Sequence, residues 1–296
     1  MTTMTSTRSK CASVSVSDLT VHKQGPRSLI NRPFALWRAA GLLMLPAILA
    51  GCAASPAERL ASQARLAGLQ PVSLPAADFM LQGFERATAG RHARIYIEGD
   101  GRPWRAGGRV IADDPSPRNL PALTWMASLP GPSLYLGRPC YFQASAQPAC
   151  NAMLWTYGRY SDQVVAAMAQ GLQSWLQRHP QIDSLTLVGH SGGGVLALLL
   201  AERLPAVVEV VTLAAPTDVA LWAELHEYTP LFASLNPADI EHWRPQVRRR
   251  LFFGEQDRQV PPASFVASAQ TIPGAQISVV PDIGHDCCAP ALWADD

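Results

Sequence analysis

A serine flanked by glycines stands where an apolar run changes into a helix-forming run. In "LTLVGHSGGGVLALLLAERL", residues 185–204, Ser191 follows Gly189 and His190 and precedes Gly192 and Gly193. A serine hydroxyl is a useful nucleophile only when a base removes its proton and a third group orients that base. Small neighbours permit a tight strand-to-helix turn that exposes the hydroxyl at the positive end of the helix. The stretch therefore predicts a nucleophile, provided that a histidine and an acid follow.

Both partners follow later in the chain, each at the end of an apolar run. Asp257 closes "LFFGEQD", and His285 closes "ISVVPDIGH". Asp218 follows an earlier apolar run and stays open as an alternative acid, with Asp257 preferred. The chain can thus supply a nucleophile, a base and an acid for acyl transfer.

The elements that must position these groups alternate between strand and helix. Strands are predicted over 93–101, 133–137, 184–189, 207–216, 249–257 and 276–285. Helices are predicted from Asp162 to a stop at Pro180 and over 193–203 and 261–270. Such alternation indicates a mostly parallel sheet with helices on both faces, whose ligands meet the loops at the carboxyl ends of the strands. Residues 217–246 are irregular and aromatic, and we expect them to form a small lid.

The order serine, acid, histidine resembles that of the α/β-hydrolase fold. The resemblance runs from about Ala93 to His285 and is carried by Gly-x-Ser-x-Gly at 189–193, "GEQDRQVP" at 254–261 and Gly284-His285. It implies one α/β domain over 78–296 with a small lid insertion at 217–246. It also implies a catalytic triad of Ser191, Asp257 and His285. Asp218 lies where some members of this family place the acid.

The same resemblance suggests the two amides of an oxyanion hole. Gly192 would supply one, and Asp100, in the turn "YIEGDGRPW", would supply the other. Glu98 departs from the family pattern, since many relatives have histidine there. This turn, with "WTYGRYS" and "LNPAD", resembles a group of exported α/β-hydrolase-like proteins. Buried unpaired carboxylates are costly, so we expect at least one ion pair to Arg102, Arg105 or Arg159.

The first fifty residues read as an export signal. A polar, basic stretch precedes the uncharged run "AAGLLMLPAILAGC", which is too short to span a bilayer. The run ends in "LAGC", which resembles a bacterial lipobox and implies acylation of Cys52. We therefore predict a signal peptide over 1–51, a tether over 52–77, and a lipoprotein of the cell envelope. Ala53 favours the outer membrane, facing the periplasm. Cleavage of an ordinary signal peptide near Ala50 is the alternative.

Cysteine usage fits an oxidising compartment. Four cysteines lie beyond Cys52 and allow three pairings. A local Cys140–Cys150 disulfide in "RPCYFQASAQPAC" is our first choice. It would leave Cys287 and Cys288 as an adjacent pair or as two free thiols.

The composition argues against several other partners. The 296 residues carry a formal net charge of +1 and no basic, aromatic-interleaved stripe, so we expect no nucleic acid. The arginines 248–250 precede an apolar strand, and we interpret them as its solvated entry. Cysteine and histidine do not have zinc-ligand spacing, and we expect neither a metal nor an organic cofactor.

The sequence thus predicts a membrane-anchored serine hydrolase that works through an acyl-enzyme. Its substrate would be an ester or thioester of a small or lipid-like acyl group, and we expect a monomer. Two rivals stay open. One is a binding lipoprotein with a vestigial Ser191, and the other is an acyltransferase that uses the same triad.

Overall fold

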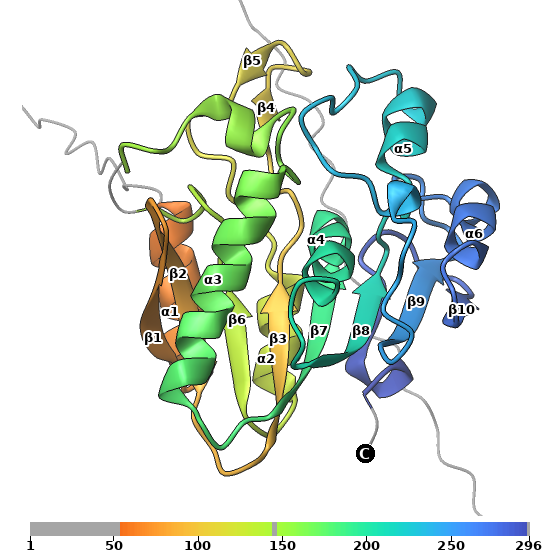
Figure 1. The fold of residues 1–296 in the computed structure, drawn as a ribbon. Helices are drawn as coiled ribbons and strands as arrows, with labels where there is room; N and C mark the ends of the chain where they lie inside the picture. The colour runs from red at the N-terminus through yellow and green to blue at the C-terminus, as the bar shows by residue number, and fades with distance from the viewer. Residues whose placement is uncertain (1–53, 144–146, 295–296) are drawn as a thin grey trace, which may run out of the picture. The chain divides into compact units, whose positions relative to one another are not determined.

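The computed structural model describes residues 54–143 and 147–294, so the predicted signal peptide and Cys52 lie outside the described residues. The described chain is built on an eight-stranded sheet of order β1-β2-β6-β3-β7-β8-β9-β10 (Figure 1). The strands are β1 Gln70–Ala76, β2 Phe79–Arg86, β3 His92–Ile97, β6 Ser133–Leu136, β7 Ser184–His190, β8 Val207–Leu213, β9 Arg248–Gly254 and β10 Ala275–Val280. The pairs β1–β2 and β2–β6 are antiparallel, and every pair from β6 to β10 is parallel.

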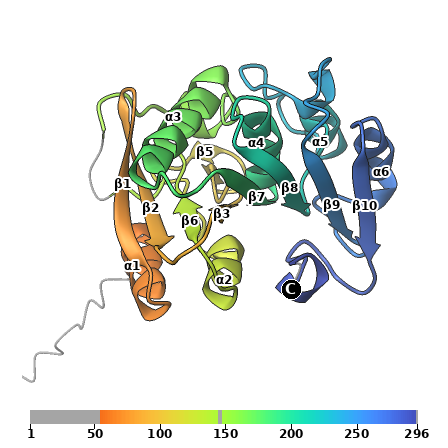
Figure 2. The same ribbon diagram turned by 60° about the horizontal axis from the view of Figure 1, so that its bottom comes forward.

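Helices cover both faces of the sheet, as the sequence predicts. Figure 2 shows α3 and α4 on one face, with α1 and α2 on the other. The helices are α1 Pro56–Leu66, α2 Pro121–Ser128, α3 Asp162–Arg178, α4 Gly192–Ala201, α5 Val219–Leu225 and α6 Pro262–Gln270. A short hairpin of β4 Trp104–Arg105 and β5 Val110–Ile111 stands apart from the main sheet, and single 3-10 turns occur at Ala152–Trp155, Pro237–Asp239 and Pro290–Leu292.

The helix that follows Ser191 is buried along its whole length. All ten residues of α4 are buried, in agreement with a sequence that is apolar all round. It packs on β7 and β8 and contacts α3. The predicted nucleophile therefore stands at the start of a helix that is enclosed by the core.

The expected tether over 52–77 is wrong for most of its length, because residues 56–76 belong to the folded domain. Helix α1 begins with a capping box between Ser55 and Glu58, and its Leu60 and Ala64 are fully buried. Strand β1 pairs with β2 from Gln70 to Ala76. The sequence did not predict this strand because Pro71 and Pro75 argue against one. Proline is tolerated in a strand at the edge of a sheet, which is where β1 lies.

The solvated reading of the arginines 248–250 is also wrong in part. Arg249 is 1% exposed, and its Nη2 lies 2.7 Å from Oε1 of Glu202. Its guanidinium carbon lies 4.7 Å from the ring centroid of Trp243. The alternation of β9 turns this arginine inward, where a carboxylate and an aromatic face compensate its burial.

No helix in the described part of the chain combines the length and the apolar character that crossing a membrane requires.

The packing of α1 makes a direct prediction. Leu60→Ala should lower the free energy of unfolding by about 2–5 kcal/mol, because it leaves a cavity in the core. Leu66→Ala, in the same helix at a side chain that is 87% exposed, should change it by less than about 0.5 kcal/mol. Urea unfolding followed by circular dichroism would measure both. If both variants change the free energy of unfolding equally and by little, α1 is a tether and not a packed part of the domain.

Candidate active site

Three side chains from three distant loops form one hydrogen-bonded row. Oγ of Ser191, directly after β7, lies 3.1 Å from Nε2 of His285. Nδ1 of the same ring lies 2.8 Å from Oδ2 of Asp257. His285 follows β10 and Asp257 follows β9, so the carboxyl ends of parallel strands bring all three together.

A strained turn presents Ser191. Its backbone has φ 50° and ψ −124°, which a residue with a Cβ adopts at a cost of about 1–3 kcal/mol. The Ser191 N–H donates to the carbonyl of Leu213 on β8 at 2.8 Å and holds the turn. A Cβ at Gly189 would overlap the backbone of Gly193, and one at Gly193 would overlap the carbonyl of Ile97. The glycines are needed because two backbones approach closely here.

Asp257 is enclosed and held as an anion. Its Oδ1 accepts hydrogen bonds from the amides of Gln259 and Val260, at 2.7 and 2.9 Å. Burial favours the neutral acid, but the hydrogen bond and charge of His285 and these two amides outweigh it, and the pKa of Asp257 is lowered. The alternative acid, Asp218, does not meet the histidine. It caps α5, accepting from the amides of Ala220 and Leu221.

The loop that carries His285 is held by contacts with His190 and Trp293. Nε2 of His190 lies 2.9 Å from the carbonyl oxygen of His285. Burial lowers the pKa of His190 to about 4, so the ring is neutral at pH 7 and donates to that carbonyl. Cys287 and Cys288 form the adjacent disulfide that the sequence left open, and the Trp293 indole donates to the Cys288 carbonyl at 3.3 Å.

The turn after β3 lies against the serine turn, as the predicted oxyanion hole requires. A Cβ on Gly99 would be 3.3 Å from Cβ of Ser191. The carboxylate of Asp100 packs on the α-carbon of Gly192, where a Cβ would overlap it. The two residues predicted to supply oxyanion amides are therefore neighbours in space.

The carboxylate of Asp100 is bound on both oxygens. Nη1 of Arg138 lies 2.6 Å from Oδ1, and Nη1 of Arg159 lies 3.0 Å from Oδ2. The Tyr160 hydroxyl donates to Oδ2 at 2.5 Å. Burial opposes ionisation of Asp100, but the charges of Arg159 and Arg138 outweigh it and lower its pKa to about 2. Arg159 is one of the expected partners. Arg138 and Tyr160 gave no sequence signal, because nothing in their spacing links them to residue 100.

Glu98 forms no ion pair in the described part of the chain. Its Oε1 accepts from the Leu123 amide, 3.1 Å away in the first turn of α2, a helix with no side-chain cap of its own. Oε2 is buried without a hydrogen-bond partner among the described residues. Burial raises the pKa of Glu98 to about 8, so this carboxyl is mainly neutral at pH 7. Arg105, another partner considered, instead pairs with Asp113 at 2.8 Å.

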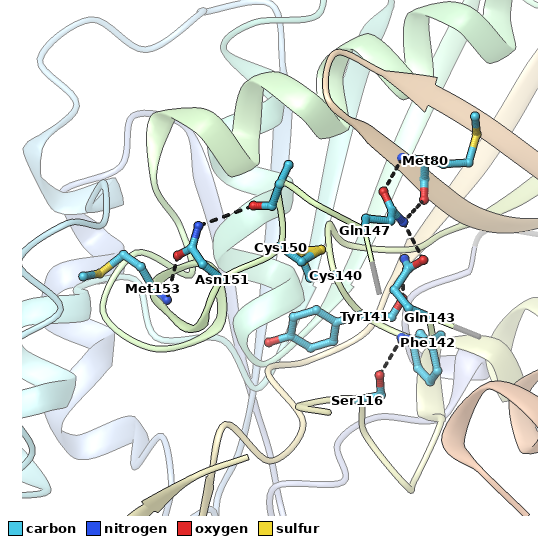
Figure 3. Close-up of a disulfide and its surroundings, with 11 residues drawn as sticks. Met80, Ser116, Cys140, Tyr141, Phe142, Gln143, Gln147, Cys150, Asn151 and Met153 are labelled. Atoms are coloured by element: carbon cyan, nitrogen blue, oxygen red, sulfur yellow. Dashed lines mark hydrogen bonds between the residues drawn. A yellow bond between two sulfur atoms is a disulfide. The ribbon is translucent and has the colours of Figure 1, made fainter. Parts of the chain in front are cut away.

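A disulfide supports the same turn from the side of β6. Cys140 and Cys150 are joined as predicted, with α-carbons 5.6 Å apart. The neighbouring Tyr141 donates its hydroxyl to the Asp100 carbonyl at 3.1 Å, and the Phe142 amide donates to Ser116 Oγ at 2.6 Å. Figure 3 shows the second of these bonds beside the disulfide. The disulfide loop thus holds Asp100 by its main chain.

A cleft of about 1800 Å³ opens over the row. Its lining includes Ser191 and His285, the turn at 98–101, the loop through β4, and Trp222 and Tyr228 of the predicted lid. The residues of the predicted lid contact the rest of the domain. Trp222 donates its indole N–H to the Gln259 carbonyl at 3.1 Å, and Phe232 stacks on Tyr157 with ring centroids 5.1 Å apart.

Among residues 54–143 and 147–294, no cluster of three histidine, cysteine or acidic side chains could hold a metal ion. The chemistry that the cleft residues themselves can perform is nucleophilic attack by an oxygen, assisted by an imidazole.

Comparisons with known proteins agree with this fold. The family model of lipase (class 3) matches residues 138–219, which include the serine turn. An esterase from Pyrococcus furiosus is 14% identical, with a TM-score of 0.54 over 74% of this chain and 83% of its own. A proline iminopeptidase-related protein from Thermus thermophilus is 14% identical, with a TM-score of 0.52 over 74% of this chain and 91% of its own. A search of curated proteins gives no match. The chain has the α/β-hydrolase fold.

The burial of Glu98 predicts a pH-dependent stability. The folded state keeps the carboxyl protonated up to about pH 8, whereas its ordinary pKa is 4.5. The contribution of the protonated carboxyl to the free energy of unfolding is therefore complete below pH 4.5, and it is lost as the pH rises to 8. Glu98→Gln keeps an acceptor for the Leu123 amide and removes the ionisation.

Melting temperatures at pH 5 and pH 9 test this. The wild type should lose more stability over that interval than Glu98→Gln. Glu255→Gln, at an exposed glutamate, should behave like the wild type. If Glu98→Gln and the wild type lose the same amount, Glu98 is already ionised in the folded protein.

Proposed function

We propose that this protein is a serine hydrolase that cleaves esters or thioesters through an acyl-enzyme. The observation that carries the proposal is the continuous row of hydrogen bonds, 3.1 Å from Ser191 to His285 and 2.8 Å from His285 to Asp257. That arrangement is what activation of a serine hydroxyl requires.

The reaction follows from these contacts. Oγ of Ser191 attacks the substrate carbonyl carbon while Nε2 of His285 takes the hydroxyl proton. Asp257 accepts a hydrogen bond from Nδ1–H, which fixes the tautomer that can accept this proton and stabilises the imidazolium that forms. As the tetrahedral intermediate collapses, His285 gives the proton to the leaving alkoxide or thiolate. Water then attacks the acyl-enzyme with the same base and releases the acid.

The amides of Gly192 and Asp100 would bind the oxygen that becomes negative in this step. Gly192 opens α4, so the positive end of that helix adds to the field at the oxyanion. The contacts on both carboxylate oxygens and on the carbonyl of Asp100 support the placement of its amide. Loss of one oxyanion donor typically lowers kcat about 100- to 1000-fold.

The shape of the cleft supports a small or lipid-like acyl substrate. The predicted lid holds one short α-helix, α5, and the cleft that Ser191 lines has a volume of about 1800 Å³. An acyltransferase would use the same acyl-enzyme and differ only in the acceptor that attacks it. The alternative of a binding protein rested on the unusual Glu98. Because Glu98 accepts a hydrogen bond from the first turn of α2, we assign this residue a structural role instead.

We also propose that lipidated Cys52 anchors the protein in the bacterial cell envelope, at the outer membrane and facing the periplasm. Support comes from the basic leader, the "LAGC" sequence and the disulfides of the domain. Cys52→Ser should abolish incorporation of labelled palmitate and move the protein from the membrane to the soluble fraction. A wild-type protein that is soluble and unlabelled would instead indicate ordinary cleavage near Ala50.

Hydrolysis of short-chain 4-nitrophenyl esters tests the triad. Ser191→Ala should lower kcat by about 10⁶-fold, and Asp257→Asn by about 10⁴-fold, because the second variant fixes the wrong histidine tautomer. Asp218→Asn is the matched control. It replaces the alternative acid with another good helix cap and should stay within a few-fold of the wild type.

The opposite ranking of the two aspartate variants would assign the acid to Asp218. An unchanged rate in Ser191→Ala would remove the hydrolase mechanism altogether.

A further inference from the structure

The wall of the cleft beside Gly192 holds more positive than negative charge. Two guanidinium groups, Arg138 and Arg159, share the single carboxylate of Asp100. The other carboxyl of this turn, Glu98, pairs with neither arginine in the described part of the chain. Tyr141 and Tyr160 contribute neutral hydroxyls. Among the described residues, the two buried guanidinium groups therefore share a single ion-paired carboxylate, and a buried charge with incomplete compensation is costly.

The two arginines differ in what they have left to offer. Arg138 does not line the cleft and uses Nη1 on Asp100 and Nη2 on the carbonyl of Arg159. Arg159 does line the cleft, together with Ser191 and Trp222. It uses Nε on the Thr156 carbonyl and Nη1 on Asp100, at 2.8 and 3.0 Å. Its Nη2 makes no hydrogen bond to any described residue.

Arg159 is also rigidly placed. Its side chain is only 6% exposed, and its guanidinium carbon lies 6.0 Å from the ring centroid of Trp222 on α5. A buried guanidinium that is fixed on two sides and lines a cleft, with one amine that makes no hydrogen bond to a described residue, is preorganised for an oxygen anion. The lid residue Trp222 would cover the apolar part of a ligand bound there.

We propose that Nη2 of Arg159 binds a carboxylate of the substrate while the scissile ester lies at Ser191. The proposal rests on the hydrolase function above and narrows it to esters that carry a carboxylate. The surplus charge in the wall then meets its counter-charge only when such a substrate is bound. A charge-assisted hydrogen bond of this kind should favour the carboxylate ester over its neutral analogue by about 10- to 100-fold in kcat/KM.

Two matched ester pairs locate the carboxylate. On the acyl side, mono-4-nitrophenyl adipate is compared with methyl 4-nitrophenyl adipate. On the leaving-group side, 4-acetoxybenzoate is compared with methyl 4-acetoxybenzoate. The readout is the ratio of kcat/KM for the charged ester to kcat/KM for the neutral ester. This ratio is compared between variants, because the intrinsic reactivity of each ester is the same for all of them. A ratio that falls in Arg159→Gln in either pair supports the subsite and shows on which side of the ester it lies.

Arg159→Gln and Arg138→Gln form the matched variants, since each removes one charge and one hydrogen bond from Asp100. Both should slow both esters by disturbing that residue. Only Arg159→Gln should lower the charged-to-neutral ratio, by about 10- to 100-fold, and Arg138→Gln should leave it within about twofold. Arg159→Lys, which keeps the charge, should retain part of the ratio if Arg159→Gln does not fold.

Two results would overturn the proposal. One is a charged-to-neutral ratio that Arg159→Gln leaves unchanged in both pairs. The other is an equal fall of the ratio in both glutamine variants, which would indicate a general field. Calorimetric binding of monomethyl adipate to Ser191→Ala separates this failure from failure of the hydrolase function. Binding that Arg159→Gln removes would support the subsite even if no ester were cleaved.

Discussion

The close approach of two backbones at Ser191 is the constraint on which the site depends. A Cβ at Gly193 would overlap the end of β3, and one at Gly189 would overlap the start of α4. A Cβ at Gly192 would overlap the side chains of Asp100 and Tyr160. The backbone contact sets Ser191 in its strained conformation and places the turn at 98–101 beside it. The strain costs about 1–3 kcal/mol, and the core around the fully buried α4 holds the turn against it.

The second constraint on the site is the charge of Asp100. The carboxylate of Asp100 sits directly on Gly192 and would repel a developing oxyanion if it were not neutralised. Two arginines and a tyrosine hydroxyl bind it, and a second tyrosine beside the disulfide holds its carbonyl. In the proposed mechanism, the cluster would leave the surroundings of the oxyanion positive instead of negative. The electrostatics of the site thus come from residues far apart in the sequence.

The sequence was sufficient for the elements whose signals are local. Glycines around Ser191, the alternation of strands and helices, and acids and histidines at strand ends predicted the parallel part of the sheet and the residues of the hydrogen-bonded row. The close pair of cysteines at 140 and 150 predicted their disulfide. These features depend on short spacing or on the rule that parallel strands end at one edge of the sheet.

Features that depend on distant partners were missed. Strand β1 carries two prolines and exists because β2 offers it an edge. Arg249 and Arg138 are buried because Glu202 and Asp100 meet them in space, which no pattern near either arginine reveals. Glu98 suggested an ion pair, but its Oε1 accepts from an amide in the first turn of α2, which no sequence signal predicted. Its Oε2 has no hydrogen-bond partner among the described residues. Tertiary contacts decided each of these cases.

The central claim is that the row of Ser191, His285 and Asp257 activates a serine nucleophile. Labelling with a fluorophosphonate probe, followed by mapping of the modified peptide, tests it without knowledge of the substrate. We predict a single adduct on Ser191 in the wild-type protein and none in Ser191→Ala. A folded wild-type protein that takes up no probe, or that carries it at another residue, would contradict the account.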